Sequence, residues 1–298
     1  MSSGRATMLI AALLICAGPA YAQDSPLHGE GPEGQGPNGG APHDPGTSGP
    51  GTSGPGSPGQ GSNLEAVGNP SLAPLKWTGL LLVPGKYKCT AQFIAPRVVL
   101  TAAHCVADQE TGELDPDKTM QFLLQWQNGQ WSQLYRPVCR AYPKEWMPER
   151  KPGQSQKDLE TARVRAHRWD YAMILVDQPS ITGYYNWEAD WKDNWKDATA
   201  TGYPRDIAEG KVVEEVHGNL QLTDLPNVVA LDHGNSNFTE GASGGVWVGN
   251  FSTSEGKTNN VALSLESFGF DDRPGVSYGP QFTAAFQDLL KFTANGCK

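Results

Sequence analysis

Short apolar runs separated by turn residues make up most of the chain after about Asn63. The runs are rich in β-branched and aromatic residues, and Gly, Pro, Asn and Asp lie between them. Runs of this length and composition are typical of β-strands. We therefore predict a mostly antiparallel all-β domain, with strands at residues 78–83, 89–94, 98–101, 120–126, 171–176, 246–248 and 261–265.

Two segments instead carry apolar or aromatic residues at helical spacing. Residues 282–293 place most of their apolar side chains on one face, which predicts a C-terminal helix packed against the β-structure. Residues 187–195 carry Trp187, Trp191 and Trp195 at intervals of four, which predicts a helix with an aromatic stripe. Such a stripe is more often buried in a core than used as a sugar- or ligand-binding platform. The charged, Pro-containing segment 144–157 predicts a loop.

The first 22 residues have the pattern of a secretory signal peptide. Arg5 supplies a positive charge, residues 8–17 are mostly apolar, and Ala20-Tyr21-Ala22 ends the segment with small residues at the required positions. The apolar run is too short to cross about 30 Å of hydrocarbon, so we expect no membrane span. We expect cleavage after Ala22 and a secreted or periplasmic mature protein.

The next segment, residues 23–62, differs in composition from the rest of the chain. Residues 24–62 contain 13 glycines, 8 prolines and no aromatic residue, and Gly-Thr-Ser-Gly-Pro occurs twice in tandem. Burial of such a segment cannot compensate for the entropy lost on ordering it. We expect a disordered linker or a propeptide, which composition does not distinguish, followed by a folded domain at residues 63–298.

Charge and cysteine content limit the partners and the compartment. The chain of 298 residues has a formal net charge of −9 at pH 7, which disfavours binding to nucleic acid or to an anionic membrane. Loss of a signal peptide leaves four cysteines, an even number that predicts two disulfides in an exported protein. These are Cys89, Cys105, Cys139 and Cys297.

A histidine and an aspartate occur at the ends of predicted strands. His104 follows an apolar strand and lies among small residues, a setting in which an imidazole can accept a proton near neutral pH. Asp170 opens the apolar strand at 171–176, so its carboxylate should be partly buried and should need a donor such as an imidazole N–H. Taken singly, each also fits an ordinary surface or turn residue.

A serine enclosed by glycines completes a possible catalytic set. Ser243 lies in Glu-Gly-Ala-Ser-Gly-Gly at 240–245, where a tight turn can expose Oγ and direct backbone N–H groups toward an anion. An isolated motif of this kind also fits a flexible hairpin turn. Its occurrence with His104 and Asp170 favours a nucleophile, a base and an orienting acid.

Together these segments resemble the chymotrypsin-like (trypsin-like) serine protease family. The resemblance rests on Thr-Ala-Ala-His-Cys at 101–105, the strand at 170–175 and Gly-Ala-Ser-Gly-Gly at 241–245, in the chain order His, Asp, Ser. Thr-Gly-Tyr-Pro at 201–204 is also similar to a segment of the bacterial glutamyl endopeptidase (V8-like) branch. The resemblance covers roughly residues 75–295 and implies two antiparallel β-barrels, a C-terminal helix and a site in the cleft between the barrels.

The resemblance also implies roles for individual residues. His104 would be the general base and then the acid, Asp170 would hold its tautomer, and Ser243 would be the nucleophile. The backbone N–H groups of Gly241 and Ser243 would form the oxyanion hole.

The same resemblance implies a disulfide between Cys89 and Cys105, next to the histidine. Cys139 and Cys297 then remain to pair with each other.

Substrate specificity is harder to predict. The resemblance places the pocket floor near Asn237 and its walls at Gly269 and Gly275, which implies room for a large side chain over a floor without full charge. Glutamyl endopeptidases use a histidine after the nucleophile, and this chain has none beyond His233. Neither trypsin-like nor glutamyl specificity is therefore supported, and Glu240 is expected to be a solvated charge.

Ala242 departs from the zymogen-activated branch of the family, which has Asp at this position. An alanine cannot pair with a newly formed N-terminal ammonium. We therefore predict a domain that is competent without a buried N-terminus.

No metal or other cofactor is expected. His167, His217 and His233 lack metal-ligand spacing and are predicted to be surface histidines. The most consistent function is a secreted, monomeric serine endopeptidase that acts on polypeptides. The alternatives are a protease-fold binding or adhesion protein, which would use the Trp stripe or the cleft, and an esterase that uses the same triad.

Overall fold

The computed structural model describes residues 66–83, 87–109, 119–149, 151–234, 236, 238, 240–254, 256 and 259–298. All of them belong to one compact unit, Ser57–Lys298. The predicted signal peptide (1–22) and the predicted linker or propeptide (23–62) lie outside the described residues.

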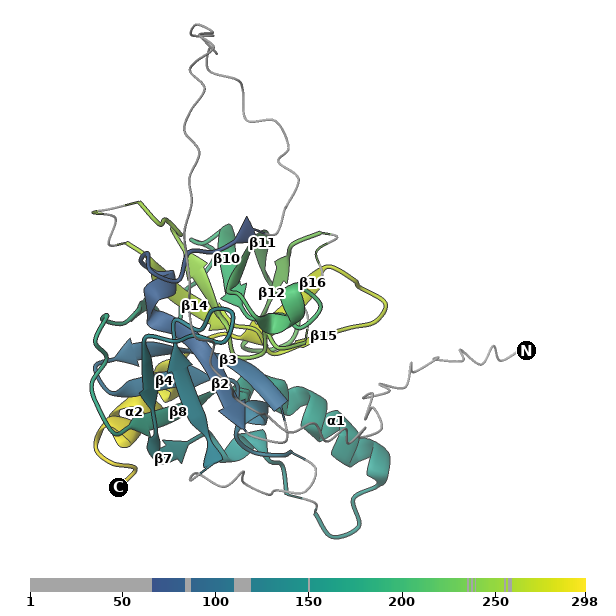
Figure 1. Ribbon diagram of the computed structural model, residues 1–298. Helices are drawn as coiled ribbons and strands as arrows, with labels where there is room; N and C mark the ends of the chain where they lie inside the picture. The colour runs from purple at the N-terminus through teal and green to yellow at the C-terminus, as the bar shows by residue number, and fades with distance from the viewer. Residues whose placement is uncertain are drawn as a thin grey trace, which may run out of the picture. The chain divides into compact units, whose positions relative to one another are not determined.

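The first sheet contains seven strands and is antiparallel throughout (Figure 1). Its strand order is β6-β5-β2-β3-β4-β8-β7. The strands are β2 (Thr78–Val83), β3 (Tyr87–Ala95), β4 (Val98–Thr101), β5 (Gln121–Leu124), β6 (Gln133–Tyr135), β7 (Pro137–Ala141) and β8 (Ala172–Val176).

The second sheet contains nine strands in the order β15-β16-β12-β11-β10-β13-β14-β9, with β1 added beside β11. β9 pairs with β14 in parallel, and the other pairings are antiparallel. The strands are β1 (Ala66–Val67), β9 (Asn186–Trp187), β10 (Asp197–Gly202), β11 (Glu214–Leu222), β12 (Val228–Asp232), β13 (Val246–Gly249), β14 (Val261–Leu265), β15 (Phe268–Gly269) and β16 (Val276–Pro280). Two curled sheets of this kind confirm the predicted fold class.

The C-terminal helix α2 (Ala284–Ala294) covers strands of the first sheet. β4 and β8 are buried at every position, as expected for strands that are covered on both faces. Phe282 and Phe286 stack with ring centroids 4.0 Å apart, and Phe286 lies 5.5 Å from the Tyr171 ring beside β8. The helix predicted at 282–293 is confirmed, although it begins two residues later because Thr283 is extended.

The helix predicted at 187–195 is absent. Trp187 lies in β9, and Asp190 has φ = +53°, which ends any regular structure there. The three indoles point to different partners: Trp187 packs on a phenylalanine of α2, Trp191 donates to a β14 carbonyl, and Trp195 donates to a nearby carboxylate. Their spacing of four therefore reflects three separate tertiary contacts, which outweigh local helical preference.

The segment 144–157, which was predicted to be a loop, contains regular structure at both ends. A 3₁₀ turn, η4 (Lys144–Trp146), lies at the start, and the helix α1 (Gln156–Ala166) begins at the end. The Ser155 hydroxyl accepts a hydrogen bond from the Asp158 N–H at 3.1 Å and caps α1. Other 3₁₀ turns lie at η1 (Leu75–Trp77), η2 (Ala103–Cys105), η5 (His167–Trp169) and η6 (Ala208–Gly210).

Two disulfides are present, and their pairings match those given above. Cys89 of β3 is bonded to Cys105 of η2. Cys139 of β7 is bonded to Cys297, next to the C-terminus. The second bond fastens the end of the chain beyond α2 to the first sheet.

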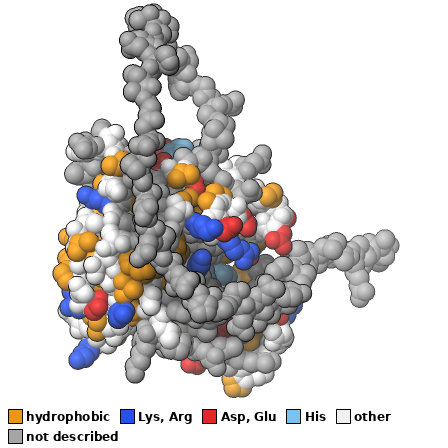
Figure 2. All heavy atoms as spheres, viewed as in Figure 1, with side chains coloured by type: hydrophobic (Ala, Val, Ile, Leu, Met, Phe, Trp, Pro, Cys, Tyr) orange, Lys and Arg blue, Asp and Glu red, His pale blue; other side chains and the backbone are white. Residues whose placement is uncertain are grey.

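The surface carries charges of both signs. On the face shown in Figure 2, Lys and Arg side chains are interspersed with Asp, Glu and hydrophobic groups. Among the described residues, no helix is long and apolar enough to cross a membrane.

Candidate active site

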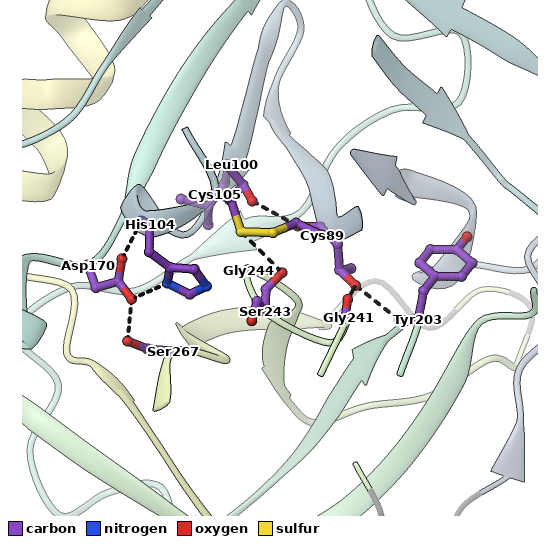
Figure 3. Close-up of a disulfide and its surroundings, with 12 residues drawn as sticks. Cys89, Leu100, His104, Cys105, Asp170, Tyr203, Gly241, Ser243, Gly244 and Ser267 are labelled. Atoms are coloured by element: carbon purple, nitrogen blue, oxygen red, sulfur yellow. Dashed lines mark hydrogen bonds and ion pairs between the residues drawn. A yellow bond between two sulfur atoms is a disulfide. The ribbon is translucent and has the colours of Figure 1, made fainter. Parts of the chain in front are cut away.

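Strand pairing in the first sheet brings His104 and Asp170 together. His104 lies in η2, directly after β4, and Asp170 lies two residues before β8. β4 and β8 pair antiparallel with Thr101 opposite Ala172, so both residues lie at the same end of the strand pair. His104 Nδ1 is 2.7 Å from Asp170 Oδ2, and the His104 backbone N–H donates to Oδ1 at 2.9 Å (Figure 3).

The Asp170 carboxylate is fully buried and is held by several donors. Besides the two donors of His104, the Ser267 hydroxyl donates to Oδ2 at 2.5 Å. Burial alone would raise the pKa of Asp170, but the charge and hydrogen bond of His104, together with the Ser267 bond, bring it below the ordinary value. The carboxylate is therefore ionised at neutral pH.

The imidazole of His104 is oriented by that carboxylate. Burial tends to lower the pKa of His104, but the charge and hydrogen bond of Asp170, with a smaller effect of the Glu266 charge, raise it above the ordinary value. Because an ionised carboxylate only accepts hydrogen bonds, Nδ1 carries the proton in the neutral ring and Nε2 keeps a lone pair. Figure 3 shows the ring between Asp170 and Ser243.

Ser243 lies on a glycine-containing turn between β12 and β13. Gly241 and Gly244 have φ = +93° and +82°, a region that favours glycine. A Cβ at Gly244 would lie 2.3 Å from Thr101 Oγ1, so close packing also requires glycine there. Ser243 is half-buried and lies beside the imidazole (Figure 3), although no hydrogen bond joins its Oγ to His104 within the described residues. Such bonds are often long without substrate.

Two buried residues of β3, Thr90 and Gln92, form hydrogen bonds that hold this turn against the first sheet. The Thr90 N–H donates to Ser243 O at 2.8 Å, and its hydroxyl donates to Gly241 O at 2.9 Å. The Gln92 amide donates to Gly244 O at 2.8 Å and accepts from the first residue of β13 at 3.1 Å. The sequence analysis missed both residues, because their spacing in a strand does not reveal a partner about 150 residues away.

The backbone N–H groups of Gly241 and Ser243 remain available as donors. Neither has a hydrogen-bond acceptor within the part of the chain that the structure describes. The carbonyl oxygens of Gly241 and Ser243 accept hydrogen bonds from Thr90 of β3, and these bonds fix the turn. The N–H groups of the same two residues take no part in fixing it. This geometry is suited to an oxyanion.

A pocket of about 540 Å³ opens beside Ser243. Gly269 lines it, and a Cβ there would meet no atom closer than 3.9 Å, so this glycine does leave space. Gly275 also lines the pocket, but a Cβ at this position would lie 1.4 Å from Gly234 O. Close contact with the Gly234 backbone, and not space for a substrate, therefore requires glycine here. Asn237, the predicted floor, lies outside the described residues.

The pocket also contains titratable residues that were not predicted there. Glu266, at the end of β14, is 7% exposed and lines the pocket. His233 is buried as well and lines the same pocket, whereas His217 is exposed, so the prediction of a surface histidine is wrong for His233. His167 is half-buried, with its ring 4.4 Å from that of Phe268, because η5 packs against β16 beside β15. Strand patterns alone do not show which residues converge on one pocket.

One group of side chains has the ligand types of a metal site. Cys89, His104 and Cys105 place their donor atoms within 4.8 Å of one another. Both sulfurs belong to a disulfide and cannot act as thiolate ligands, so this group does not fit a metal ion.

Comparison with solved structures shows the same fold in bacterial proteases and in a heparin binding protein. A glutamyl endopeptidase matches with a TM-score of 0.60 and 19% identity over 78% of this chain and 96% of its own. The protease Anisep from Arthrobacter nicotinovorans matches with a TM-score of 0.58 and 17% identity over 79% and 100% of the two chains. A mutant of human heparin binding protein matches with a TM-score of 0.55 and 14% identity over 78% and 96%. No curated protein sequence matches the chain.

The model of the family described as Trypsin matches residues 66–229, which is more than half of the chain. The match includes His104 and Asp170 and ends before Ser243. Together with the two curled sheets, it establishes that the chain belongs to the trypsin family of serine endopeptidases.

Proposed function

We propose that the mature chain is an exported endopeptidase that hydrolyses peptide bonds through an acyl-enzyme on Ser243. The proposal rests on one observation above all: a buried, ionised Asp170 holds His104 at 2.7 Å beside a serine at the mouth of a pocket. These are the parts that nucleophilic acyl transfer requires.

The reaction would proceed in two halves. Ser243 Oγ attacks the substrate carbonyl while its proton passes to His104 Nε2, and the N–H groups of Gly241 and Ser243 stabilise the oxyanion. His104 then protonates the leaving amine, the C–N bond breaks, and an ester on Ser243 remains. A water molecule gives a proton to His104, attacks the ester and releases the acid, and the proton returns to Ser243.

A free sheet edge favours a peptide over a small ester as the substrate. β15 lies at the end of the second sheet, so its outer edge pairs with no other strand of the described chain. β15 follows Ser267, and both Phe268 and Gly269 line the pocket. An extended substrate backbone can add to such an edge.

The rival binding-protein function has less support. Trp187, Trp191 and Trp195 form no common face, since each is engaged in a different internal contact. The fold itself does not distinguish an enzyme from a binding protein, because a heparin binding protein has the same fold. The conjunction of His104, Asp170 and Ser243 favours catalysis.

We infer export and the domain boundaries from the sequence. We assign residues 1–22 to a signal peptide, 23–62 to a linker or propeptide and 63–298 to the protease domain. Two disulfides are consistent with an oxidising compartment. Ala242 is fully buried in an apolar cluster with no counter-charge for an ammonium, which supports activity without a buried N-terminus.

The proposal is tested by labelling the mature protein, from Gln23 onward, with an alkyl fluorophosphonate. We expect one label per molecule, complete loss of labelling in Ser243→Ala, and normal labelling in Ser254→Ala, in which an exposed serine is replaced. Wild type that has not met the reagent should also cleave peptides, and labelling of Ser243 should abolish this cleavage. Absence of labelling in folded wild type would refute the proposal, and labelling with cleavage of esters alone would favour the esterase.

A further inference from the structure

Glu266 lines the pocket next to Ser243 and carries a buried carboxylate. It follows β14, is 7% exposed, and is fixed by its own backbone, because its N–H donates to Gly245 O at 2.8 Å. Its carbonyl accepts the Gly244 N–H at 2.7 Å. The residue that carries this carboxylate is therefore attached directly to the turn that holds Ser243.

The partners of the Glu266 carboxylate are neutral. The Trp247 indole N–H donates to Oε2 at 3.1 Å, and the Ser277 hydroxyl forms a second hydrogen bond. Among the described residues, no Lys, Arg or His forms an ion pair with it. A carboxylate accepts about four hydrogen bonds, so two neutral donors leave acceptor capacity on a group that lines the pocket.

Burial without a cation destabilises the charged form. It raises the pKa of Glu266 to about 7, even though Ser277, Trp247 and His104 act in the opposite direction. A cation that entered the pocket would remove much of this cost, because it would supply the missing counter-charge in a desolvated setting. The pocket is thus more complementary to a positively charged group than to a neutral one.

The other charged groups around Glu266 are consistent with a cationic ligand. Glu240 and Asp271 line the same pocket and add negative charge, while Arg273 also lines it and is exposed. Glu240 is exposed and paired with Arg205, so its effect is screened.

His233 is connected to Glu266 through a serine. Its Nε2 lies 3.0 Å from Ser277 Oγ, and its Nδ1 lies 2.7 Å from Ser236 Oγ. Because the Ser277 hydroxyl donates to the Glu266 carboxylate, its oxygen is left to accept from the imidazole. His233 is thus linked to Glu266 through a hydroxyl.

We propose that Glu266 is a specificity-determining residue and selects substrates with Lys or Arg immediately before the cleaved bond. This inference rests on the proposed function for its substrate, but the charge recognition itself does not require catalysis. The acidic group would come from the end of the strand beside the nucleophile turn, and not from the position that the sequence analysis predicted for the pocket floor. The open space at Gly269 leaves room for a long side chain.

The first test measures binding without catalysis, in the Ser243→Ala protein. The probes are benzamidine, a planar cation, and benzamide, its uncharged counterpart of similar shape, both titrated by calorimetry at pH 8. We expect benzamidine to bind at least tenfold more tightly than benzamide. Glu266→Gln should lower benzamidine affinity by about 30-fold or more and change benzamide affinity by less than about threefold.

A matched control replaces an exposed carboxylate of the same pocket. Glu240→Gln should lower benzamidine affinity by no more than about threefold, because solvent screens this charge. An equal effect of the two substitutions, or no effect of Glu266→Gln, would overturn the proposal. If Glu266→Gln does not fold, equal binding of benzamidine and benzamide to the Ser243→Ala protein would overturn it as well.

The second test uses peptide substrates that differ only in the residue before the cleaved bond. Wild type should prefer Lys and Arg, and Glu266→Gln should lower the ratio of kcat/KM on these peptides to kcat/KM on a peptide with Phe at that position by about 30-fold or more. Labelling together with a preference for Glu or Phe that Glu266→Gln leaves unchanged would reject the inference and retain the function. Failure to label or cleave would reject the function, and the benzamidine titration would still decide the role of Glu266.

Discussion

Asp170 and Glu266 are both buried carboxylates near Ser243, but they face different groups. Asp170 contacts an imidazole that can carry a positive charge, whereas Glu266 contacts an indole N–H and a hydroxyl. Burial raises the pKa of either group, and the imidazole reverses this effect at Asp170 only. The pKa of Asp170 consequently lies below its ordinary value, and that of Glu266 is about 7.

The difference shows that two buried carboxylates of one site can have different roles, which depend on whether a cationic partner is present. The negative charge of a buried carboxylate with a cationic partner is compensated, and the carboxylate orients that partner. The charge of a buried carboxylate with neutral partners is not compensated, so this carboxylate would favour a cationic ligand. Ser267 donates to Asp170 and directly follows Glu266, so the two environments are separated by a single peptide unit.

Removing the charge of Asp170 should have the largest effect. Asp170→Asn should lower kcat by about 10⁴-fold, because the amide no longer holds the Nδ1–H tautomer of His104 or stabilises its protonated form. The measurement is kcat, normalised to active sites titrated with a fluorophosphonate. Asp177→Asn, an exposed carboxylate just beyond the other end of β8, is the control and should stay within about threefold of wild type. A less than tenfold loss in Asp170→Asn would contradict the assigned role.

A third carboxylate with no partner would extend the comparison. Ala242→Asp places a charge in a fully buried apolar cluster, and it should lower the free energy of unfolding by about 3–5 kcal/mol. The measurement is urea denaturation of the mature protein. Ala284→Asp should be nearly neutral, because Ala284 is exposed at the first position of α2. If Ala242→Asp were as stable as wild type, the prediction that a charge has no partner at this buried position would be wrong.

The two carboxylates should also affect the pH dependence of stability with opposite signs. Glu266 ionises near pH 4.5 in the unfolded chain and near 7 in the folded one, so its contribution to stability falls as pH rises through this window. Asp170 has a lowered folded pKa, so its contribution is present above pH 3.8 and is lost only as pH falls below it. Glu266→Gln should therefore gain stability relative to wild type, on the order of 2–3 kcal/mol, between pH 5 and pH 8.

This prediction is checked by urea denaturation of wild type and Glu266→Gln at several pH values. Glu240→Gln, the exposed carboxylate of the same pocket, should show no such trend. A stability difference between wild type and Glu266→Gln that stays constant or reverses would contradict the electrostatic contrast.

The smallest expected effect concerns the acidic limb of the activity profile. Protonated His104 cannot accept the Ser243 proton, so kcat/KM should fall as pH drops through the His104 pKa, which lies above 6.5. The Glu266 charge contributes to that raised value. Glu266→Gln should therefore move the acidic limb to lower pH, measured with a peptide whose residue before the cleaved bond is uncharged. Movement to higher pH would show that Glu266 does not act on His104.

The grouping of His104, Asp170 and Ser243 was predictable because each residue belongs to a short contiguous motif. The backbone around His104 and Ser243 needs small residues and glycine, and these needs appear directly in the local sequence. Strands β4 and β8 were predictable for a similar reason, since burial on both faces leaves an uninterrupted apolar run. Local constraints of this kind can be read from the amino-acid sequence, because they act on neighbouring residues.

Contacts between distant segments were not predictable. The Trp187–Trp195 spacing indicated a helix, whereas the structure gives each indole a separate partner. Glu266 and His233, which are 33 residues apart, line one pocket, and Ser277 of β16 forms a hydrogen bond to each of them. α1 was missed, although Ser155 followed by Asp158 is a recognisable cap.

The Cys139–Cys297 bond closes a covalent loop that spans 158 residues and includes both α1 and Ser243. A single backbone cut inside this loop therefore divides the chain without releasing either piece. Lys157 and Arg165 are exposed basic residues on α1, where an enzyme with the proposed preference would cut another copy of itself. Nicked molecules would run as one band without reductant and as two bands with it, so self-digestion at α1 need not separate His104 from Ser243.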